Sequence, residues 1–367
     1  MTAGSNETKP TYSMKAMEMM PSETPAERLR NFFYMCRSHG NTGLLVLLGV
    51  LYLSFSLVLP GRFATHDTLV SMMFQLPELG LLALAMLFPL LSGGFNLAII
   101  ATTNMAALLM AWIMTSYVDP TGGNTGLIVV LALVAGLLAC ILVGAITGYL
   151  VATLNTHPIL VTLGTMSIIN GTSVWLTRGK PIAGFPDVVQ AVGSSMVFGV
   201  PLPFWIFIAT TIAVGLVLSR TRFGISVYMV GSNLEATRYS GINTRNVLIG
   251  IYAASSVMCW LAAILMMARF NSASAGYAAS YLLITVLAAI LGGVDPNGGF
   301  GRVSGLYIAL LVLQVISSGL NLLGVNTQLT AATWGGTMIV VMIVRYTIAR
   351  FGLFKPRRVA AKTVTQV

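Results

Sequence analysis

Side chains that could carry out catalysis or bind a metal ion are few in this sequence, and they lie far apart. The cysteines lie far apart and show no CxxC or CxxC…His spacing, and no Ser/His/Asp or Cys/His catalytic arrangement emerges. A nucleophile needs a base beside it, and a metal needs several converging ligands. The sequence therefore predicts no catalytic residue, no metal site and no enzyme. The residues considered are Cys36, Cys140, Cys259, His39, His66 and His157.

The letters LSGG at residues 91–94 suggest a nucleotide site, because a signature loop of ATPase domains reads the same way. That loop acts beside a phosphate-binding GxxxxGK[ST] segment, and this chain contains none. We therefore interpret Gly93 and Gly94 as part of an apolar run. Two interpretations stay open, namely close helix packing through small residues, and a helix break that faces a substrate path and offers the Asn96 amide to it.

Amide and carboxyl side chains inside the apolar runs are the second set of candidates. Sugars are bound by amides and aromatic faces with few full charges, but the same amides also form hydrogen bonds between helices. Glu78, beside Pro77, is acidic and lies well inside an apolar run, which makes it a functional candidate or a structural residue near a kink. The predicted translocation-path candidates are Gln75, Glu78, Asn96, Asn104, Asn170, Gln314 and Asn321.

The composition shows what kind of fold must position these residues. Hydrophobic residues make up 56% of the 367 residues, and only 8% are charged, whereas a soluble domain carries about a quarter charged residues. This places the chain among polytopic membrane proteins, with lipid as a partner. The net charge of +10 comes mostly from Lys and Arg at the edges of apolar segments. We therefore expect it to orient the protein in the membrane and not to bind nucleic acid.

Ten apolar segments are long enough to be membrane spans, since one crossing needs about 20 apolar residues. The predicted fold class is all-α, a polytopic membrane protein with about ten transmembrane helices. Because Gly or Pro interrupts several segments, we expect some helices to be broken or re-entrant. The predicted spans are 43–60, 69–91, 95–117, 126–152, 158–177, 203–219, 246–269, 279–294, 303–323 and 328–349.

The basic residues predict the orientation of these spans. With the N-terminus inside, most Lys and Arg residues fall in inner segments, which predicts that both termini face the cytoplasm. The basic residues that fall in outer segments are Arg62, Arg178, Lys180 and Arg269.

Three regions follow from this arrangement. Residues 1–42 are polar and lack the apolar core of a cleavable signal peptide, so we expect a cytoplasmic tail there. Its residues 26–38 form either a basic interfacial helix or a continuation of the unstructured tail. Residues 43–350 form the transmembrane domain, and residues 351–367 form a basic cytoplasmic tail.

The polar loop at residues 220–245 carries its own helix signals. Ser232 followed by Glu235 reads as a capping box, and Gly241 provides a left-handed stop, which predicts a helix from about Asn233 to Ser240. Glu235 and Arg238 are spaced to pair weakly. A helix this short is unstable alone in water, so it must dock against the membrane domain or a partner. It is either an ordinary loop helix or the mechanical contact with a separate ATPase.

Four motifs together resemble the ribose-permease branch of ABC importers, whose members are membrane subunits for monosaccharide uptake. The resemblance runs from about residue 74 to residue 346, with the motifs in the same order. The motifs are VTLGTMSIINGTSVWLTRGKPI at 161–182, TRFGISVYMVGSNLEATRYSGIN at 221–243, LGGVDPNGGFGRVSG at 291–305 and SGLNLLGV at 318–325.

The resemblance implies an all-α permease in the bacterial inner membrane that has no cofactor of its own. ATP would be bound by a separate cytoplasmic ABC ATPase subunit, a periplasmic binding protein would deliver the substrate, and a second permease copy or a paralogue would complete the path. The coupling helix of the family falls on the loop above. Its residues here are Gly231, Ser232, Asn233, Glu235, Ala236, Arg238 and Gly241.

The chain also departs from the family pattern. Where the family usually has GGIDLS, this chain has GGFNLA at residues 93–98, so that Asn96 replaces an aspartate. A charge near the path becomes a neutral amide, and a partner permease would have to supply the acid. The expected cargo is a small sugar. The alternatives are a nucleoside, a furanose-type signal or a flavin in the same architecture, and a secondary transporter in place of an ATP-driven importer.

Overall fold

The computed structural model describes residues 41–117, 124–154, 156–326, 329–330, 332–339 and 343. By their contacts the residues form two units, Met1–Gly43 and Leu44–Val367, and nearly all described residues belong to the second. The predicted N-terminal tail with its interfacial helix and the C-terminal basic tail lie outside the described residues, apart from the last residues before the first span.

Each predicted span before residue 328 coincides with a helix, and the ends differ by a few residues. The described residues of the last span are helical at 329–330, 332–339 and 343. The span helices are α2 (Thr42–Val58), α3 (His66–Leu91), α4 (Ile99–Tyr117), α5 (Thr125–Thr153), α6 (Pro158–Thr177), α8 (Leu202–Arg220), α11 (Thr244–Phe270), α12 (Tyr281–Leu291) and α13 (Val303–Leu322).

Among the described residues, 7 helices are long and apolar enough to cross a membrane, and α2 and α12 are shorter apolar helices. Lipid offers no hydrogen-bond partner to a backbone, so an apolar chain satisfies its N–H and C=O groups within helices. The all-α polytopic prediction is confirmed at this level. The only departures among the described residues are two-residue strands, which join loops between helices.

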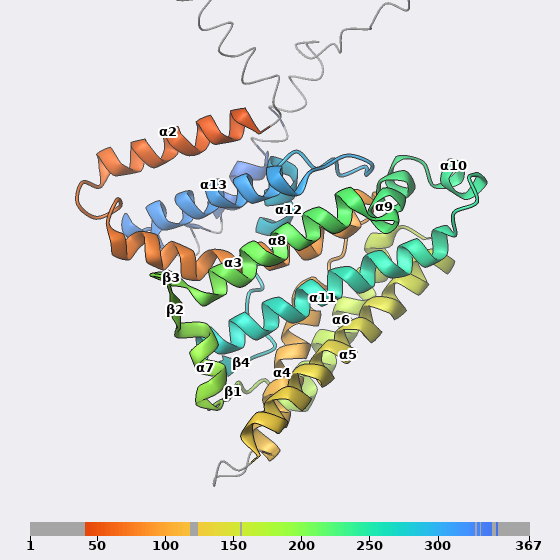
Figure 1. The fold of residues 1–367 in the computed structure, drawn as a ribbon, viewed down its shortest axis with the longest axis horizontal. Helices are drawn as coiled ribbons and strands as arrows, with labels where there is room; N and C mark the ends of the chain where they lie inside the picture. Colours follow the sequence, from red (N-terminus) through yellow and green to blue (C-terminus); the bar gives the residue numbers. More distant parts are fainter. Residues whose placement is uncertain are drawn as a thin grey trace, which may run out of the picture. The chain divides into compact units, whose positions relative to one another are not determined.

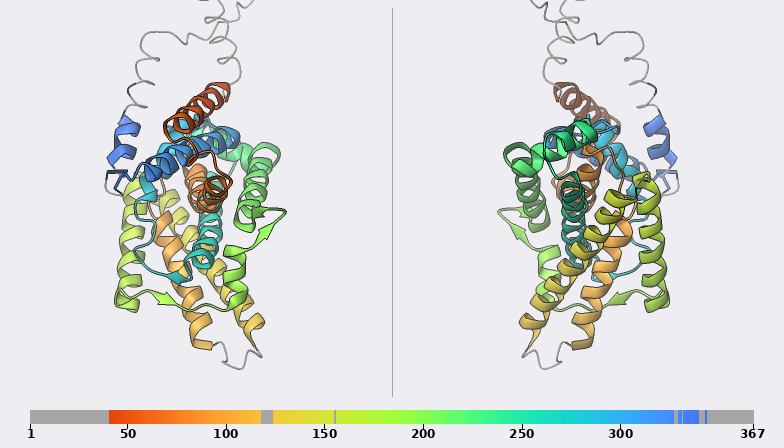
Figure 2. Two further views of the ribbon diagram at one scale, coloured as in Figure 1. Left: turned by 90° about the vertical axis from the view of Figure 1, so that its left-hand side faces the viewer. Right: turned by 90° about the vertical axis from the view of Figure 1, so that its right-hand side faces the viewer.

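The buried centre of the bundle is α3, which packs against α8, α11, α12 and α13 (Figure 1). Its residues from Leu76 to Leu91 are all buried, as expected for a helix that is hydrophobic on every side. By contrast, fewer than a third of the residues in the apolar windows of α5, α6 and α8 are buried. Figure 2 shows α5 and α6 beside α4 on one flank of the bundle.

Glycines allow α5 and α11 to approach closely. A Cβ on Gly144 would lie 2.6 Å from the carbonyl oxygen of Tyr252, and one on Gly148 would lie 2.7 Å from the Cα of Ile249. Small residues at helix contacts are typical of membrane proteins, because close packing replaces the hydrophobic effect there.

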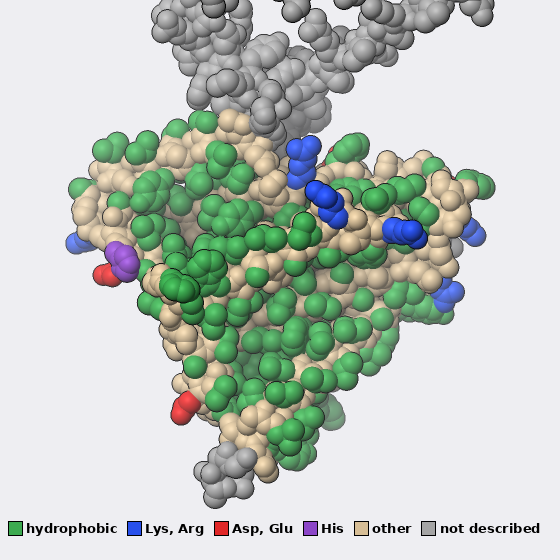
Figure 3. Space-filling model, viewed as in Figure 1, with side chains coloured by type: hydrophobic (Ala, Val, Ile, Leu, Met, Phe, Trp, Pro, Cys, Tyr) green, Lys and Arg blue, Asp and Glu red, His purple; other side chains and the backbone are tan. Residues whose placement is uncertain are grey.

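The bundle has two distinct ends. The α10 end contains α9 (Arg222–Ser232), α10 (Leu234–Tyr239), the turn at 92–98 and the loop at 292–302. The β4 end contains α7 (Asp187–Ser194) and the pair of β1 (Ile182–Ala183) with β4 (Ser272–Ala273). A second short pair, β2 (Met196–Val197) with β3 (Val200–Pro201), leads into α8. Figure 3 shows Lys and Arg side chains gathered toward the α10 end of one face.

Candidate functional site

The predicted coupling helix is present as α10, but its cap differs from the prediction. Ser232 is the last residue of α9, and Asn233, with extended backbone angles of φ −162° and ψ 108°, caps α10. The Asn233 side chain accepts a hydrogen bond of 2.9 Å from the Ala236 amide. The prediction of a Ser232–Glu235 capping box is therefore wrong. With Asn233 as the cap, Glu235 stands one position too early to reach back to it.

The end of α10 follows the prediction. Gly241 has a φ of +80°, the left-handed conformation that favours glycine, and its amide donates to the Arg238 carbonyl at 3.1 Å. Both Glu235 and Arg238 lie in the described ranges, and no ion pair joins them. Their side chains are therefore free to meet charges on a partner.

Nearly the whole of α10 is exposed, and only Thr237 is buried. Leu234 is 44% exposed and Tyr239 is 88% exposed. An exposed tyrosine on a six-residue helix lacks the packing that such a short helix needs. Aromatic residues of this kind are common anchors in protein interfaces. The helix therefore has the exposure and chemistry of a docking element.

Gly231 joins this element to the membrane domain. A Cβ on Gly231 would overlap the Leu91 carbonyl oxygen and would lie 2.5 Å from the Gly299 amide nitrogen. That amide donates to the same Leu91 oxygen at 2.9 Å. The last turn of α9, the end of α3 and the loop before α13 thus meet backbone to backbone, with no side chain between them. Because closely packed backbone is hardly compressible, a displacement of α9 would be passed on to the end of α3.

Two further contacts strengthen this junction, which we call the glycine junction (Leu91, Gly93, Gly231, Gly298 and Gly299). Gly93 and Gly298 have φ of +79° and +91°, and their backbones touch. The Tyr228 hydroxyl donates to the Gly301 carbonyl at 3.0 Å. Burial raises the pKa of Tyr228 above its usual value, and the charge of Arg302 opposes this only in part. The phenol therefore keeps the proton that it donates.

Asn96 closes the turn between α3 and α4. Its Nδ2 donates to the Ser255 hydroxyl at 3.1 Å, and its Oδ1 accepts from the Ala98 amide at 3.1 Å. The Ser255 hydroxyl in turn donates to the Ala85 carbonyl at 2.7 Å. The helix break predicted at LSGG is this turn, and protein surrounds it.

The other path candidates fall into three groups. Gln75 and Gln314 meet across α3 and α13, where the Gln314 Nε2 donates to the Gln75 Oε1 at 3.3 Å. Asn104 donates to the Ala275 and Tyr277 carbonyls at 2.8 and 2.9 Å, and so holds the loop before α12. Two candidates, Asn170 on α6 and Asn321 near the end of α13, are exposed and join neither group.

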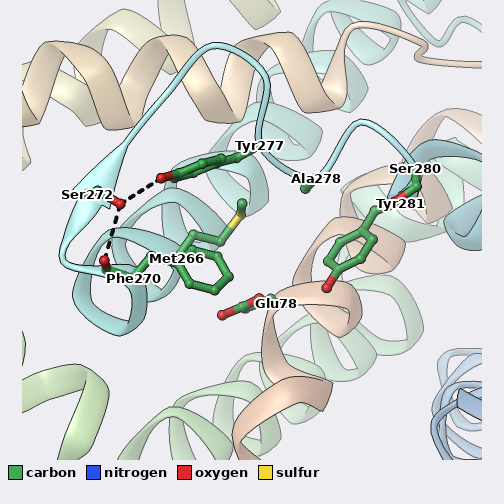
Figure 4. Close-up of a pocket in the computed structure, with 8 residues that line it drawn as sticks. All are labelled: Glu78, Met266, Phe270, Ser272, Tyr277, Ala278, Ser280 and Tyr281. Atoms are coloured by element: carbon green, nitrogen blue, oxygen red, sulfur yellow. Dashed lines mark hydrogen bonds between the residues drawn. The ribbon is translucent and has the colours of Figure 1, made fainter. Parts of the chain in front are cut away.

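Glu78 lies at the edge of a cavity near the β4 end. Its Oε1 accepts a 3.0 Å hydrogen bond from Arg269, the last basic residue of α11. Figure 4 shows the carboxylate between the ends of Phe270 and Tyr281. The sequence separates Glu78 and Arg269 by 191 positions. No local signal relates residues so far apart, so reasoning from the sequence missed this partner.

The fold defines a multi-pass membrane protein with an exposed short helix, α10, at one end. A family model described as the permease component of the branched-chain amino acid transport system matches residues 68–342. The chain belongs to this family of bacterial ABC importer permeases. In this family a separate ATPase subunit handles ATP, so the chain is a transport subunit without a catalytic site of its own.

Curated relatives cover most of the chain. It is 30% identical over 284 residues to the L-arabinose transport system permease protein AraH of Escherichia coli (strain K12), which covers 77% of this chain and 84% of the relative. It is 29% identical over 288 residues to the ribose import permease protein RbsC of Bacillus subtilis (strain 168), which covers 78% of this chain and 87% of the relative. It is also 28% identical over 299 residues to the autoinducer 2 import system permease protein LsrD of Salmonella typhi, which covers 80% of this chain and 87% of the relative. No solved structure matches the chain significantly.

Proposed function

We propose that this chain is the membrane permease of an ATP-driven importer for a small sugar of the pentose class. A periplasmic binding protein delivers the sugar, and an ABC ATPase subunit docks on α10. The observation that carries the proposal is the glycine junction, because it links an exposed docking helix to the most buried helix of the bundle. The names of relatives that transport L-arabinose and ribose support the substrate class.

The proposed topology has about ten membrane spans and both termini in the cytoplasm. It rests on the arginines of the α10 end, because the positive-inside rule assigns the side that carries more basic residues to the cytoplasm. They are Arg220, Arg222, Arg238, Arg245 and Arg302. In this topology the transmembrane domain covers residues 43–350, and residues 220–245 form the coupling loop.

The permease works as one half of a dimer with a second copy or a paralogue. The exposed apolar faces of α5, α6 and α8 are available to lipid and to that second permease. The path between the halves draws on polar residues of the spans, both buried and exposed. The proposed members are Gln75, Glu78, Asn96, Asn104, Asn170, Gln314 and Asn321.

A second candidate cargo is a furanose-type signal molecule. It is favoured by the similarity to the autoinducer 2 permease, whose identity to this chain is only slightly lower than that of the sugar permeases. Both cargo classes carry several hydroxyl groups on a small skeleton. The polar path described above therefore suits either.

The test is uptake into proteoliposomes that contain the permease, its ATPase subunit and its binding protein. We expect ATP, and not ADP, to drive accumulation of radiolabelled L-arabinose or D-ribose, or of autoinducer 2 in the second case. The permease alone should neither hydrolyse ATP nor accumulate any of these. Accumulation by the permease alone along an ion gradient would replace the proposal with a secondary transporter.

A further inference from the structure

We infer that the cavity beside Glu78 is a binding subsite for a polyhydroxylated ring, in which the free oxygen of the Glu78 carboxyl group accepts a hydrogen bond from a ring hydroxyl group. The inference rests on the proposed function and deepens it, because it assigns the recognition chemistry to one place on the path. The cavity has a volume of about 400 Å³ and lies between α3, the end of α11 and the start of α12. This size falls in the usual range of small-molecule sites.

The carboxylate of Glu78 is only half satisfied. The residue is 1% exposed, and Arg269 holds its Oε1, but among the described residues Oε2 is buried without a hydrogen-bond partner. A buried charge is costly unless its lone pairs are used. Such an oxygen beside a cavity is an unused acceptor for a donor supplied by a ligand. Arg269 also donates to the Phe74 carbonyl at 3.4 Å, which fixes its position.

The other walls supply what a sugar ring requires. The Ser272 and Tyr277 hydroxyls lie 2.7 Å apart, and Ser272 also donates to the Phe270 carbonyl (Figure 4). The Tyr281 ring extends its hydroxyl toward the helix that carries Glu78. Hydroxyl groups can donate and accept, and the rings of Phe270 and Tyr281 offer apolar faces to the C–H groups of a sugar.

The cavity wall is held in shape before any ligand arrives. Asn104 clamps the loop before α12 through its two hydrogen bonds to the Ala275 and Tyr277 carbonyls. Asn271 Oδ1 accepts from the Phe185 amide at 3.0 Å and ties the end of α11 to the loop that follows β1. A preformed wall lowers the ordering cost of binding. One of the two oxygens of the Glu78 carboxyl group is already paired with Arg269. The site therefore offers the cargo few hydrogen bonds, and its binding stays weak enough for release inward.

The inference is tested by protection of an introduced thiol. Ser280 lines the cavity and is exposed, so Ser280→Cys places a maleimide target at its wall. Cys36→Ser removes a native thiol outside the described residues, and the native Cys140 and Cys259 are buried. The full-length permease in proteoliposomes is labelled with and without 50 mM D-ribose or L-arabinose. Tetrahydropyran, a ring without hydroxyl groups, serves as the ligand control.

We expect at least one of the two sugars to slow labelling about threefold or more, and tetrahydropyran to have no effect. Glu78→Gln should abolish the protection, because losing hydrogen bonds to a charged group weakens binding by about tenfold or more. Asp187→Asn, which neutralises an exposed carboxylate at the same end, should retain it. Tyr281→Phe removes one hydroxyl group and should weaken protection, which keeps the test informative if Glu78→Gln does not fold.

Failure of both sugars to protect, or equal protection in Glu78→Gln, would overturn the subsite. ATP-driven uptake is measured in parallel proteoliposomes that also contain the ATPase subunit and the binding protein. Uptake without protection would refute the subsite and leave the proposed function intact. Protection without uptake would support the subsite and contradict the proposed function.

Discussion

Gly231, in the last turn of α9, lies so close to the carbonyl oxygen of Leu91, at the end of α3, that a methyl group on Gly231 would overlap it. One residue belongs to the segment that presents the docking helix, and the other ends the central helix of the bundle. Because nothing but backbone separates them, we expect a shift of α10 to move the end of α3. This contact is the physical basis of the coupling proposed above.

Gly231→Ala should separate nucleotide hydrolysis from transport. Alanine favours the helical conformation of α9, but its methyl group would push α9 away from Leu91 at an overpacking cost of about 1–3 kcal/mol. We expect ATP-driven uptake to fall by about tenfold while the ATPase subunit still binds. Gly215→Ala is the control, since the nearest atom to its Cβ belongs to Val303 at 4.0 Å. Equal uptake in the two variants would refute the role of the junction.

Glu235→Lys should weaken binding of the ATPase subunit. The side chain is exposed on α10, so reversing its charge perturbs a docking surface without changing the core. Exposed ion pairs contribute about 0.2–1 kcal/mol each, and we expect a several-fold loss in co-purification at low salt. Asp187→Lys makes the same change at the β4 end and should have no effect. Full binding and transport by Glu235→Lys would count against α10 as the docking site.

Tyr239→Ala should have a larger effect than Glu235→Lys. The ring is 88% exposed, and a tyrosine buried on complex formation commonly costs 2 kcal/mol or more when truncated, roughly a thirtyfold change in affinity. The measurement is the dissociation constant of the permease–ATPase complex in detergent, with the unfolding temperature of the permease as a control. An unchanged dissociation constant would exclude the ring from the interface.

Asn233→Ala should destabilise α10, whereas Ser232→Ala should not. Asn233 caps the helix through the Ala236 amide, and loss of such a cap costs about 1 kcal/mol. Hydrogen exchange at Ala236 should therefore accelerate about fivefold in Asn233→Ala only. Faster exchange in Ser232→Ala alone would restore the capping box predicted from the sequence.

Asn96→Leu separates a structural role from a role in the path. The substitution leaves the Ala98 amide without its acceptor, which should lower the free energy of unfolding by about 1–3 kcal/mol. Uptake per folded molecule is then measured after correction for the amount of folded transporter. Normal stability with reduced uptake would indicate that the amide acts on the cargo.

The helices were predictable because lipid leaves an apolar chain few alternatives. Span limits such as 158–177 match α6 to the residue. Local sequence signals also predicted α10 and its end at Gly241. They did not distinguish Ser232 from Asn233 as the capping residue, because both residue types cap helices well. The glycine junction and the Glu78–Arg269 pair join residues far apart in the chain. Periodicity and turn chemistry carry no information about such contacts, so they emerge only from the packed structure.

The most direct test of the account is a crosslink from α10 to the ATPase subunit. Leu234→Cys places a thiol on the exposed helix, and Asp187→Cys places one at the opposite end of the bundle. In the assembled transporter a short bifunctional reagent should join Leu234→Cys, and not Asp187→Cys, to the ATPase subunit, with a yield that changes between ATP and ADP. A transporter that imports its cargo but yields no such adduct from α10 would contradict the account.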